Sequence, residues 1–319
     1  MSLKKISIAA AFVFGIFSAQ AQQYPFWTHT RSTLFLNNPA VAGTRKTLDA
    51  RMSYRQQWMG FDGAPKTSTI GIHGRFYKGK MGAGGFIYTD KIGPSSFTAY
   101  SASFAYHIKF EDTELSFGVN GSYNVQLMDP NKITYHNSQD FAAESAIAYN
   151  KSKIPNAAFG VLYYNDRFYL GASVNNLLGS SYEFPKSADK KGHMQTVPHY
   201  SLNIGYNWAS DPNYIFENSV FVNYVAGTPI LLDYNLRFHI KHAFFVGAGI
   251  RMKSAVIFQT GVTIDNTMQI AYSYDFTTNA LRTFNTGTHE IKFVYTYDKD
   301  RHQKHGQNSG FARQHYHLL

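Results

Sequence analysis

The sequence of 319 residues has no cysteine, few charged residues and, beyond its N-terminus, no long apolar run. The lack of cysteine excludes disulfides, thiolate metal sites and a lipid anchor attached through cysteine. Charged residues make up 16% of the chain, whereas soluble domains carry about 25%. Without an apolar run of about 20 residues, a chain does not cross a bilayer as a helix. A mean hydropathy of −0.30 is still compatible with a membrane protein that crosses as strands.

The chain instead repeats one alternating pattern about fourteen times between Thr47 and Tyr297, in runs of about ten to twelve residues. Apolar or aromatic side chains stand at every second position, with small polar ones between them. In one run the apolar positions are Leu115, Phe117, Val119, Gly121, Tyr123, Val125 and Leu127. The same alternation covers residues 230–240 and 269–276. Because side chains alternate across a strand, each run predicts a strand with one apolar and one polar face.

Two classes of protein contain such strands: a soluble β-sandwich and a membrane β-barrel. Soluble strands are usually about five or six residues long, whereas a tilted membrane-crossing strand needs roughly nine to eleven. The polar faces consist mostly of Ser, Asn, Thr and Gly, which suit a lumen better than bulk water. Aromatic residues, 16% of the chain, gather near the predicted strand ends, where interfacial girdles lie. We therefore predict an all-β fold, a transmembrane antiparallel β-barrel of the bacterial outer membrane.

The connections between the predicted strands alternate in length. Short turns are expected near residues 78–80, 111–112, 165–166, 210–213, 241–242 and 265–266. Longer connections are expected near 59–67, 90–96, 128–153, 177–198 and 278–286, with two tight ones at 227–228 and 253–254. Outer-membrane barrels have short periplasmic turns and longer outer loops. The spacing predicts about fourteen strands, with twelve as the alternative, and both termini in the periplasm. The lumen of such a barrel must hold water or a plug.

The N-terminus has the features of a secretion signal. Lys4 and Lys5 precede an apolar stretch from about Ile6 to Phe17, and Ala19-Gln20-Ala21 forms a small-residue cleavage site, with cleavage after Ala21. We expect four parts: a signal peptide at 1–21, a periplasmic or lumenal segment at 22–46, the barrel at 47–297 and a basic, His-rich tail at 298–319.

Charge and titratable residues point to no reaction. The net charge is +10, and removal of Lys4 and Lys5 leaves 28 of the 30 basic residues against 20 acidic ones, spread along the chain as in solvated loops. Four of the thirteen histidines lie in the tail without the spacing of a closed metal site. Lumenal Arg237 and His239 are expected to pair with Asp233 or Asp275. We expect no enzyme activity, cofactor, metal site or nucleic-acid partner.

The first long connection has the composition of a structured loop. It mixes aromatic residues with Gly and Pro, which fix the backbone shape. Two interpretations are equally weighted: a rim turn in which Trp58 only anchors at the membrane interface, and a contact site for a protein partner. The candidate partner-binding residues are Arg55, Gln57, Trp58, Gly60, Phe61, Gly63, Pro65 and Lys66.

Several segments resemble the PorP/SprF family of type IX secretion system outer-membrane proteins of Bacteroidota. The matching segments are Asn38-Pro39-Ala40 with 42–45, residues 54–58 with 60–67, Asp90-Lys91-Ile92-Gly93-Pro94, Tyr163-Tyr164 before Phe168-Tyr169, and Leu281-Arg282 with Asn285 and Gly287. The similarity covers nearly the whole mature chain. The chain departs from the family in continuing beyond its last aromatic strand, which places Ile291, Phe293, Tyr295 and Tyr297 inside the sequence.

The resemblance implies a non-enzymatic barrel that assists export or surface anchoring of proteins with type IX C-terminal signals, including gliding adhesins. The implied partners are the C-terminal domains of secreted cargo, other type IX secretion and periplasmic ring components, and outer-membrane lipid. The competing class is a porin-like or hydrophobic-solute channel, which would conduct through its lumen. A third class, a loop-borne enzyme, would need a nucleophile and a base at one rim, and nothing in the sequence joins such a pair.

Overall fold

The structure is a computed structural model that describes residues 27–45, 47–129, 132, 151–183, 193–211, 213–265 and 267–297. The expected signal peptide with Ala19 and Ala21, the tail at 298–319 and most of the connection at 128–153 lie outside the described residues. Within the described ranges, helices that are both long and apolar enough to cross a membrane are absent.

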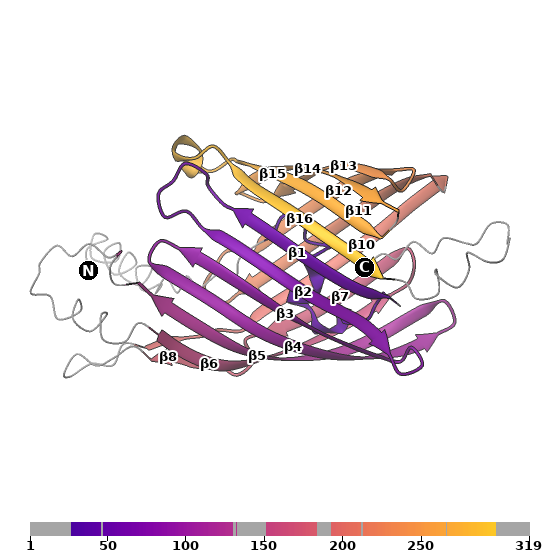
Figure 1. The fold of residues 1–319 in the computed structure, drawn as a ribbon, viewed down its shortest axis with the longest axis horizontal. Coiled ribbons are helices and arrows are strands. Elements are labelled where there is room, and N and C mark those ends of the chain that lie inside the picture. Colours follow the sequence, from indigo (N-terminus) through magenta and orange to yellow (C-terminus); the bar gives the residue numbers. More distant parts are fainter. Residues whose placement is uncertain are drawn as a thin grey trace, which may run out of the picture.

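Fourteen antiparallel strands close into one barrel, as the sequence predicts (Figure 1). They are β1 (Leu48–Gln56), β2 (Lys66–Phe76), β3 (Met81–Ile92), β4 (Ser95–Phe110), β5 (Thr113–Met128), β6 (Lys151–Tyr164), β7 (Phe168–Asn175), β10 (His199–Asp211), β11 (Tyr214–Val225), β12 (Leu231–Ile240), β13 (Phe244–Arg251), β14 (Ala255–Ile264), β15 (Met268–Thr277) and β16 (Thr288–Tyr297). Each strand pairs with its neighbour in sequence, and β1 pairs with β16 to close the ring. Two short strands, β8 (Ser181–Glu183) and β9 (His193–Gln195), form a separate hairpin within the connection at 177–198.

The apolar faces of the strands point outward. On β5, Phe117, Val119 and Tyr123 are exposed, whereas Ser116 and Asn124, which lie on the alternate face, are buried in the lumen. The same division holds on β12 and β15, so the alternation predicted from the sequence is confirmed. Exposed large apolar side chains surround the whole cylinder, which a soluble protein would have to cover. Lipid supplies that cover, and the closed ring leaves no open strand edge within it.

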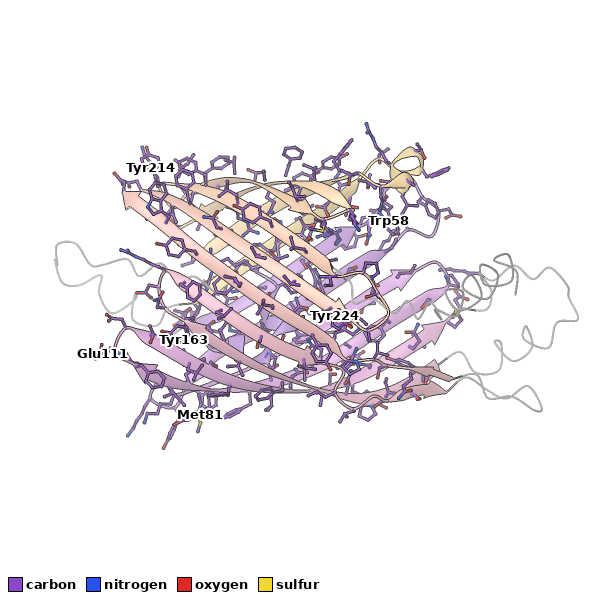
Figure 2. The ribbon with its side chains drawn as sticks, turned by 180° about the vertical axis from the view of Figure 1, so that it is seen from behind. Trp58, Met81, Glu111, Tyr163, Tyr214 and Tyr224 are labelled. Carbon is purple, nitrogen blue, oxygen red and sulfur yellow. The ribbon has the colours of Figure 1, made fainter. Side chains whose placement is uncertain are left out.

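The two ends of the barrel differ in their connections. At one end, which we call the short-turn rim, two or three residues separate most of the paired strands, and the chain begins β1 at Leu48 and ends β16 at Tyr297. At the other end, the long-loop rim, lie the connections at 57–65 and 278–287 and the β8–β9 hairpin. Figure 2 shows Met81, Glu111 and Tyr214 at the short-turn rim and Trp58 at the opposite end.

One predicted long connection is wrong. Strands β3 and β4 continue to Ile92 and from Ser95, so the expected loop at 90–96 is a two-residue turn of Gly93 and Pro94. Gly93 adopts φ +53, the left-handed region that glycine enters without strain. In the sequence, the Gly-Pro pair indicates a longer loop. In the structure, the flanking residues Asp90, Lys91 and Ser95 pair across the two strands and extend the sheet up to the turn.

Candidate functional site: the lumenal segment and the long-loop rim

Residues 27–45 lie inside the barrel (Figure 1). This lumenal segment contains one helical turn, α2 (Leu34–Asn37), followed by a 3-10 turn, η1 (Pro39–Val41). Of the two positions that the sequence left open for residues 22–46, the described part occupies the lumen. Trp27, Leu34 and Phe35 pack with Phe86 and Tyr88 of the wall to form the main apolar cluster of the interior.

The local sequence explains the bend in the segment. Asn38 adopts an extended conformation and its side chain accepts a hydrogen bond of 2.9 Å from the backbone N–H of Ala40, as an N-cap does. Pro39 follows at the first position of η1, where its missing N–H leaves nothing unsatisfied. Gly43, at φ +75, then turns the chain toward the short-turn rim and β1.

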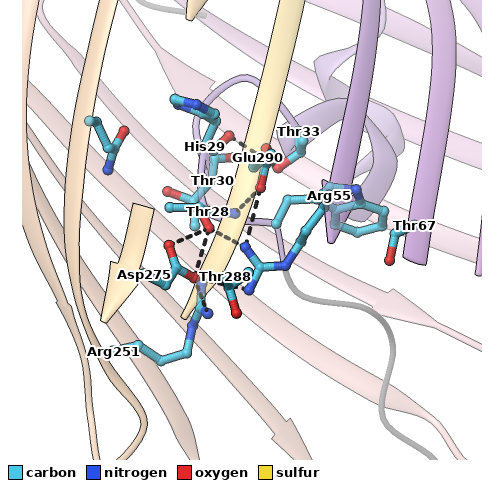
Figure 3. Close-up of polar contacts among 12 residues, drawn as sticks. Thr28, His29, Thr30, Thr33, Arg55, Thr67, Arg251, Asp275, Thr288 and Glu290 are labelled. Atoms are coloured by element: carbon cyan, nitrogen blue, oxygen red, sulfur yellow. Dashed lines mark hydrogen bonds and ion pairs between the residues drawn. The ribbon is translucent and has the colours of Figure 1, made fainter. Parts of the chain in front are cut away.

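One end of the segment is held by a buried ionic network, which we call the Thr28 latch (Figure 3). The backbone N–H of Thr28 donates to the Glu290 carboxylate at 2.7 Å, and its hydroxyl donates to Asp275 at 2.8 Å. Arg55 of β1 donates to the Thr28 hydroxyl and, at 2.9 Å, to Asp275. Arg251 of β13 reaches Asp275 at 3.1 Å. The network therefore connects the segment to β1, β13, β15 and β16.

Removing Arg55 from the latch leaves the buried Glu290 carboxylate without its ion-pair partner. Arg55 and Glu290 are almost completely buried, and Asp275 is shared by Arg55 and Arg251. Loss of one partner from a buried ion pair typically costs about 3–5 kcal/mol, because the remaining charge stays desolvated. The latch thus holds Thr28, near the N-terminal end of the lumenal segment, against the barrel wall.

The other end of the segment packs against glycine residues of the barrel wall. A Cβ atom added to Gly82 would lie 2.0 Å from the carbonyl oxygen of Ala42. One added to Gly118 would lie 2.2 Å from the Ala40 nitrogen, and one added to Gly160 would lie 2.0 Å from the Asn38 side-chain oxygen. These glycines belong to β3, β5 and β6. We call them the glycine face; only residues without a side chain allow the segment to approach so closely.

Polar wall side chains satisfy the backbone of the segment at this face. Ser116 donates to the carbonyl oxygen of Ala40 at 2.8 Å, and Ser173 and Asn175 donate to that of Asn37 at 2.8 and 2.9 Å. Conversely, the Asn38 side chain donates to the carbonyl oxygen of Val161 at 3.1 Å. Buried carbonyl groups need such partners. The segment is thus bonded to the wall at both ends.

The loop at 57–65, which contains most of the predicted partner-binding residues, is ordered by its neighbours. The Gln57 N–H donates to the Pro65 carbonyl at 2.9 Å, and the Met59 N–H donates to the Gly287 carbonyl at 2.8 Å. Gly63 accepts a hydrogen bond of 2.9 Å from the N–H of Gly93. Gly60 and Gly63 adopt positive φ values of +96 and +70, respectively. The composition that indicated a structured loop is explained by these contacts.

The predicted partner-binding residues do not share one surface. Gly60, Phe61, Gly63 and Lys66 are exposed, Gln57 and Trp58 are half-buried, and Pro65 is buried. Arg55 is 2% exposed and points into the lumen as part of the Thr28 latch. The inward position of Arg55 follows from strand alternation, because it lies two residues from Ser53 and one from outward-facing Tyr54.

Three connections that are distant in sequence come together at the long-loop rim. Met59 forms backbone hydrogen bonds with residues 286 and 287 on one side, and Gly63 accepts one from Gly93 on the other. The 3-10 turn η3 (Ala280–Phe284) belongs to the same connection as residues 286 and 287, and Phe284 is 66% exposed. We call the surface of Met59, Phe61, Gly93 and Phe284 the loop cluster. The segments that carried the family resemblance at 57–67, 90–94 and 281–287 meet there.

The predicted ion pairing of lumenal side chains is confirmed, but the predicted partners are wrong. Arg237 and His239 contact Glu217, at 3.3 and 2.8 Å, rather than Asp233 or Asp275. Asp233 and Asp275 pair with Arg251 instead. Pairing depends on which strands are neighbours and in what register, and Arg237 lies directly across from Glu217 in the β11–β12 ladder. Sequence reasoning also missed Thr28, Glu290 and the glycine face, although inward Gly at alternate strand positions was a usable signal.

Among the described residues, no group of three or more His, Asp or Glu side chains is arranged to hold a metal ion. Burial lowers the pKa of His29 in the lumenal segment well below its ordinary value, so this imidazole is neutral at pH 7. The tail histidines considered in the sequence lie outside the described residues.

The closed ring, the apolar outer face and the polar interior define an outer-membrane β-barrel protein. A family model described as type IX secretion system membrane protein PorP/SprF matches residues 19–295. The chain therefore belongs to the PorP/SprF family and is a membrane component of the type IX secretion system. No curated protein sequence matches the chain.

The solved structures similar to this chain include outer-membrane barrel proteins. A FadL homologue from Pseudomonas aeruginosa aligns with a TM-score of 0.50 and 10% identity, over 84% of this chain and 94% of the other. The outer membrane protein Omp33 from Acinetobacter baumannii aligns with a TM-score of 0.45 and 10% identity, over 80% of this chain and 99% of that one. At such identities the likeness to the FadL homologue concerns the fold alone.

Proposed function

We propose that the chain is a non-enzymatic barrel that assists export or surface anchoring of proteins with type IX C-terminal signals. In this proposal the loop cluster contacts the C-terminal domain of the cargo, and the short-turn rim faces the periplasm and the secretion apparatus. The observation that carries the proposal is the meeting of three family-resembling connections at one exposed, partly apolar surface.

The occupied lumen supports contact rather than conduction. Residues 27–45 lie across the interior, with the Thr28 latch at one end and the glycine face at the other. A porin-like or hydrophobic-solute channel, the alternative function, needs a passage through this volume. We expect the intact protein to give little conductance in planar bilayers, and a steady open pore without any effect on export would favour the channel.

Deletion of the gene tests the proposal directly. We expect proteins that carry type IX C-terminal signals to be lost from the cell surface, as measured by surface proteomics before and after complementation. An unchanged surface proteome would contradict the proposed role, provided that the secretion apparatus itself is active in the same cells.

Single substitutions in the loop cluster test where the cargo binds. Phe61→Ser removes a side chain that is 51% exposed, and Trp58→Ala removes its half-buried neighbour; both are expected to lower cargo retention while the barrel still assembles. Tyr77→Ser, which removes a 62% exposed aromatic from the short-turn rim, is the matched control. Loss of the heat-modifiable folded form in Trp58→Ala would show that the loop is structural.

A further inference from the structure

A cavity of about 230 Å³ lies between the lumenal segment and the wall, near the short-turn rim. Arg31, Ser32 and Arg45 of the segment line one side, and Arg51 and Arg237 of β1 and β12 line the other. His242 and Thr267, in two short turns, form its outer lining. The cavity is smaller than pockets for drug-sized ligands, which occupy about 300–1,000 Å³.

Positive charge exceeds negative charge around this cavity. Among the described residues, two carboxylates face its guanidinium groups, and each is shared. Glu217 contacts Arg31 and, at 3.3 Å, Arg237, and Asp49 contacts Arg51 and, at 2.8 Å, Arg45. The pairs therefore leave the group positive, in an interior where water screens charge weakly.

Lys292 adds a fifth basic side chain at the inner end of the cavity. Its side chain is fully buried on the inward face of β16. Lys292 lies two residues before Val294, which lines the cavity. Its amino group donates to the Ser32 hydroxyl, and the carboxylates that act on it, Glu290 and Glu217, lie beyond ion-pair distance. Burial disfavours the charged form of Lys292, so an anion beside it would stabilise the ammonium group.

We propose that this cavity binds a small phosphate-bearing dianion that reaches it from the short-turn rim. Guanidinium groups approach from three elements, namely the lumenal segment, β1 and β12. This arrangement suits a tetrahedral oxyanion better than a planar carboxylate, and Arg is the side chain that binds phosphate in a bidentate manner. The bound anion would join Ser32 and Arg31 of the segment to the wall.

Isothermal titration of the full mature chain, folded in detergent micelles, tests this site. Inorganic phosphate and glucose 6-phosphate are titrated at constant ionic strength, and saturable binding of one anion per chain is expected. Thr263→Glu places a carboxylate in the cavity lining and is expected to raise the dissociation constant at least about tenfold by charge repulsion. Thr228→Glu, in a turn at the long-loop rim, is the matched control and should bind as the parent does.

Three results would overturn the proposal: no saturable heat with either phosphate compound, equal weakening by both substitutions, or succinate binding as tightly as phosphate. Binding of the first compound but not the second would support the site and identify free phosphate as the ligand. Folding of each variant is checked by its heat-modifiable mobility. Gln269→Glu, at another lining position, replaces Thr263→Glu if that variant does not fold.

Discussion

At the scale of single residues, burial has turned charged side chains into structural contacts. In the sequence, Arg55 directly precedes a predicted surface loop. In the structure, Thr28, Asp275 and Glu290 surround its side chain. A guanidinium group can serve several acceptors at once because its five N–H donors have a fixed geometry. Arg55 thus binds both the wall strands and the lumenal segment.

We expect Arg55→Gln to destabilise the folded barrel. The substitution leaves Glu290 without an ion-pair partner and Asp275 with Arg251 alone, and should reduce the free energy of unfolding by about 3–5 kcal/mol. Urea unfolding in lipid vesicles, followed by tryptophan fluorescence, measures the change. Lys66→Gln, which alters an exposed residue at the start of β2, is the control. Equal unfolding midpoints for the two variants would contradict the role given to the latch.

At the scale of elements, residues 38–42 of the lumenal segment can lie close to β3, β5 and β6 because the wall has glycines there. Gly118 and Gly121 lie on the same strand and have opposite surroundings. A Cβ at Gly118 would collide with Ala40, whereas one at Gly121 would meet nothing within 4 Å. Strand alternation in the sequence already places Gly118 on the inward face and Gly121 on the outward face. Only the three-dimensional position of the segment shows that Gly118 lies against Ala40.

Gly118→Leu is expected to displace the lumenal segment. Because the chain has no native cysteine, Ala40→Cys provides a single reporter, which should resist a polar maleimide in the parent barrel, where Ala40 is fully buried. Labelling should become fast when Gly118→Leu is added and stay slow with Gly121→Leu. Slow labelling in both double variants would show that the segment does not depend on the glycine face.

The strands were predictable because their signal is local. Alternation on β5, β12 and β15 requires only neighbouring residues. Five of the six predicted short turns fall between two paired strands, and the sixth, at 210–213, overlaps the end of β10. The site was not predictable to the same degree. Thr28 meets Asp275 across 247 positions of sequence, and a single sequence carries no information on such pairing. Arg55 was predicted to bind a partner because the residues that follow it form the exposed loop. Its side chain instead contacts Thr28, Asp275 and Glu290, which are distant in sequence.

At the scale of the whole molecule, the interior resembles a protein core more than an aqueous pore. Deleting residues 27–45 should therefore raise single-channel conductance in planar bilayers severalfold, because a barrel of this size is about twice as wide as side chains alone can fill. Heat-modifiable mobility checks that the shortened chain still forms a barrel. Gly118→Leu, which keeps the full chain, should also raise conductance. If neither variant conducts more than the parent, the segment does not obstruct the lumen.

The two attachment points of the lumenal segment lie on opposite sides of the ring. Thr28 contacts Asp275 on β15, and Asn38 contacts Val161 on β6, which is seven strands from β15 in either direction around the fourteen. The segment is thus a brace across the diameter of the cylinder. A circular cross-section cannot become oval along that axis without breaking hydrogen bonds at one end. A lateral force on one arc of the ring would therefore be transmitted through the segment to the opposite arc.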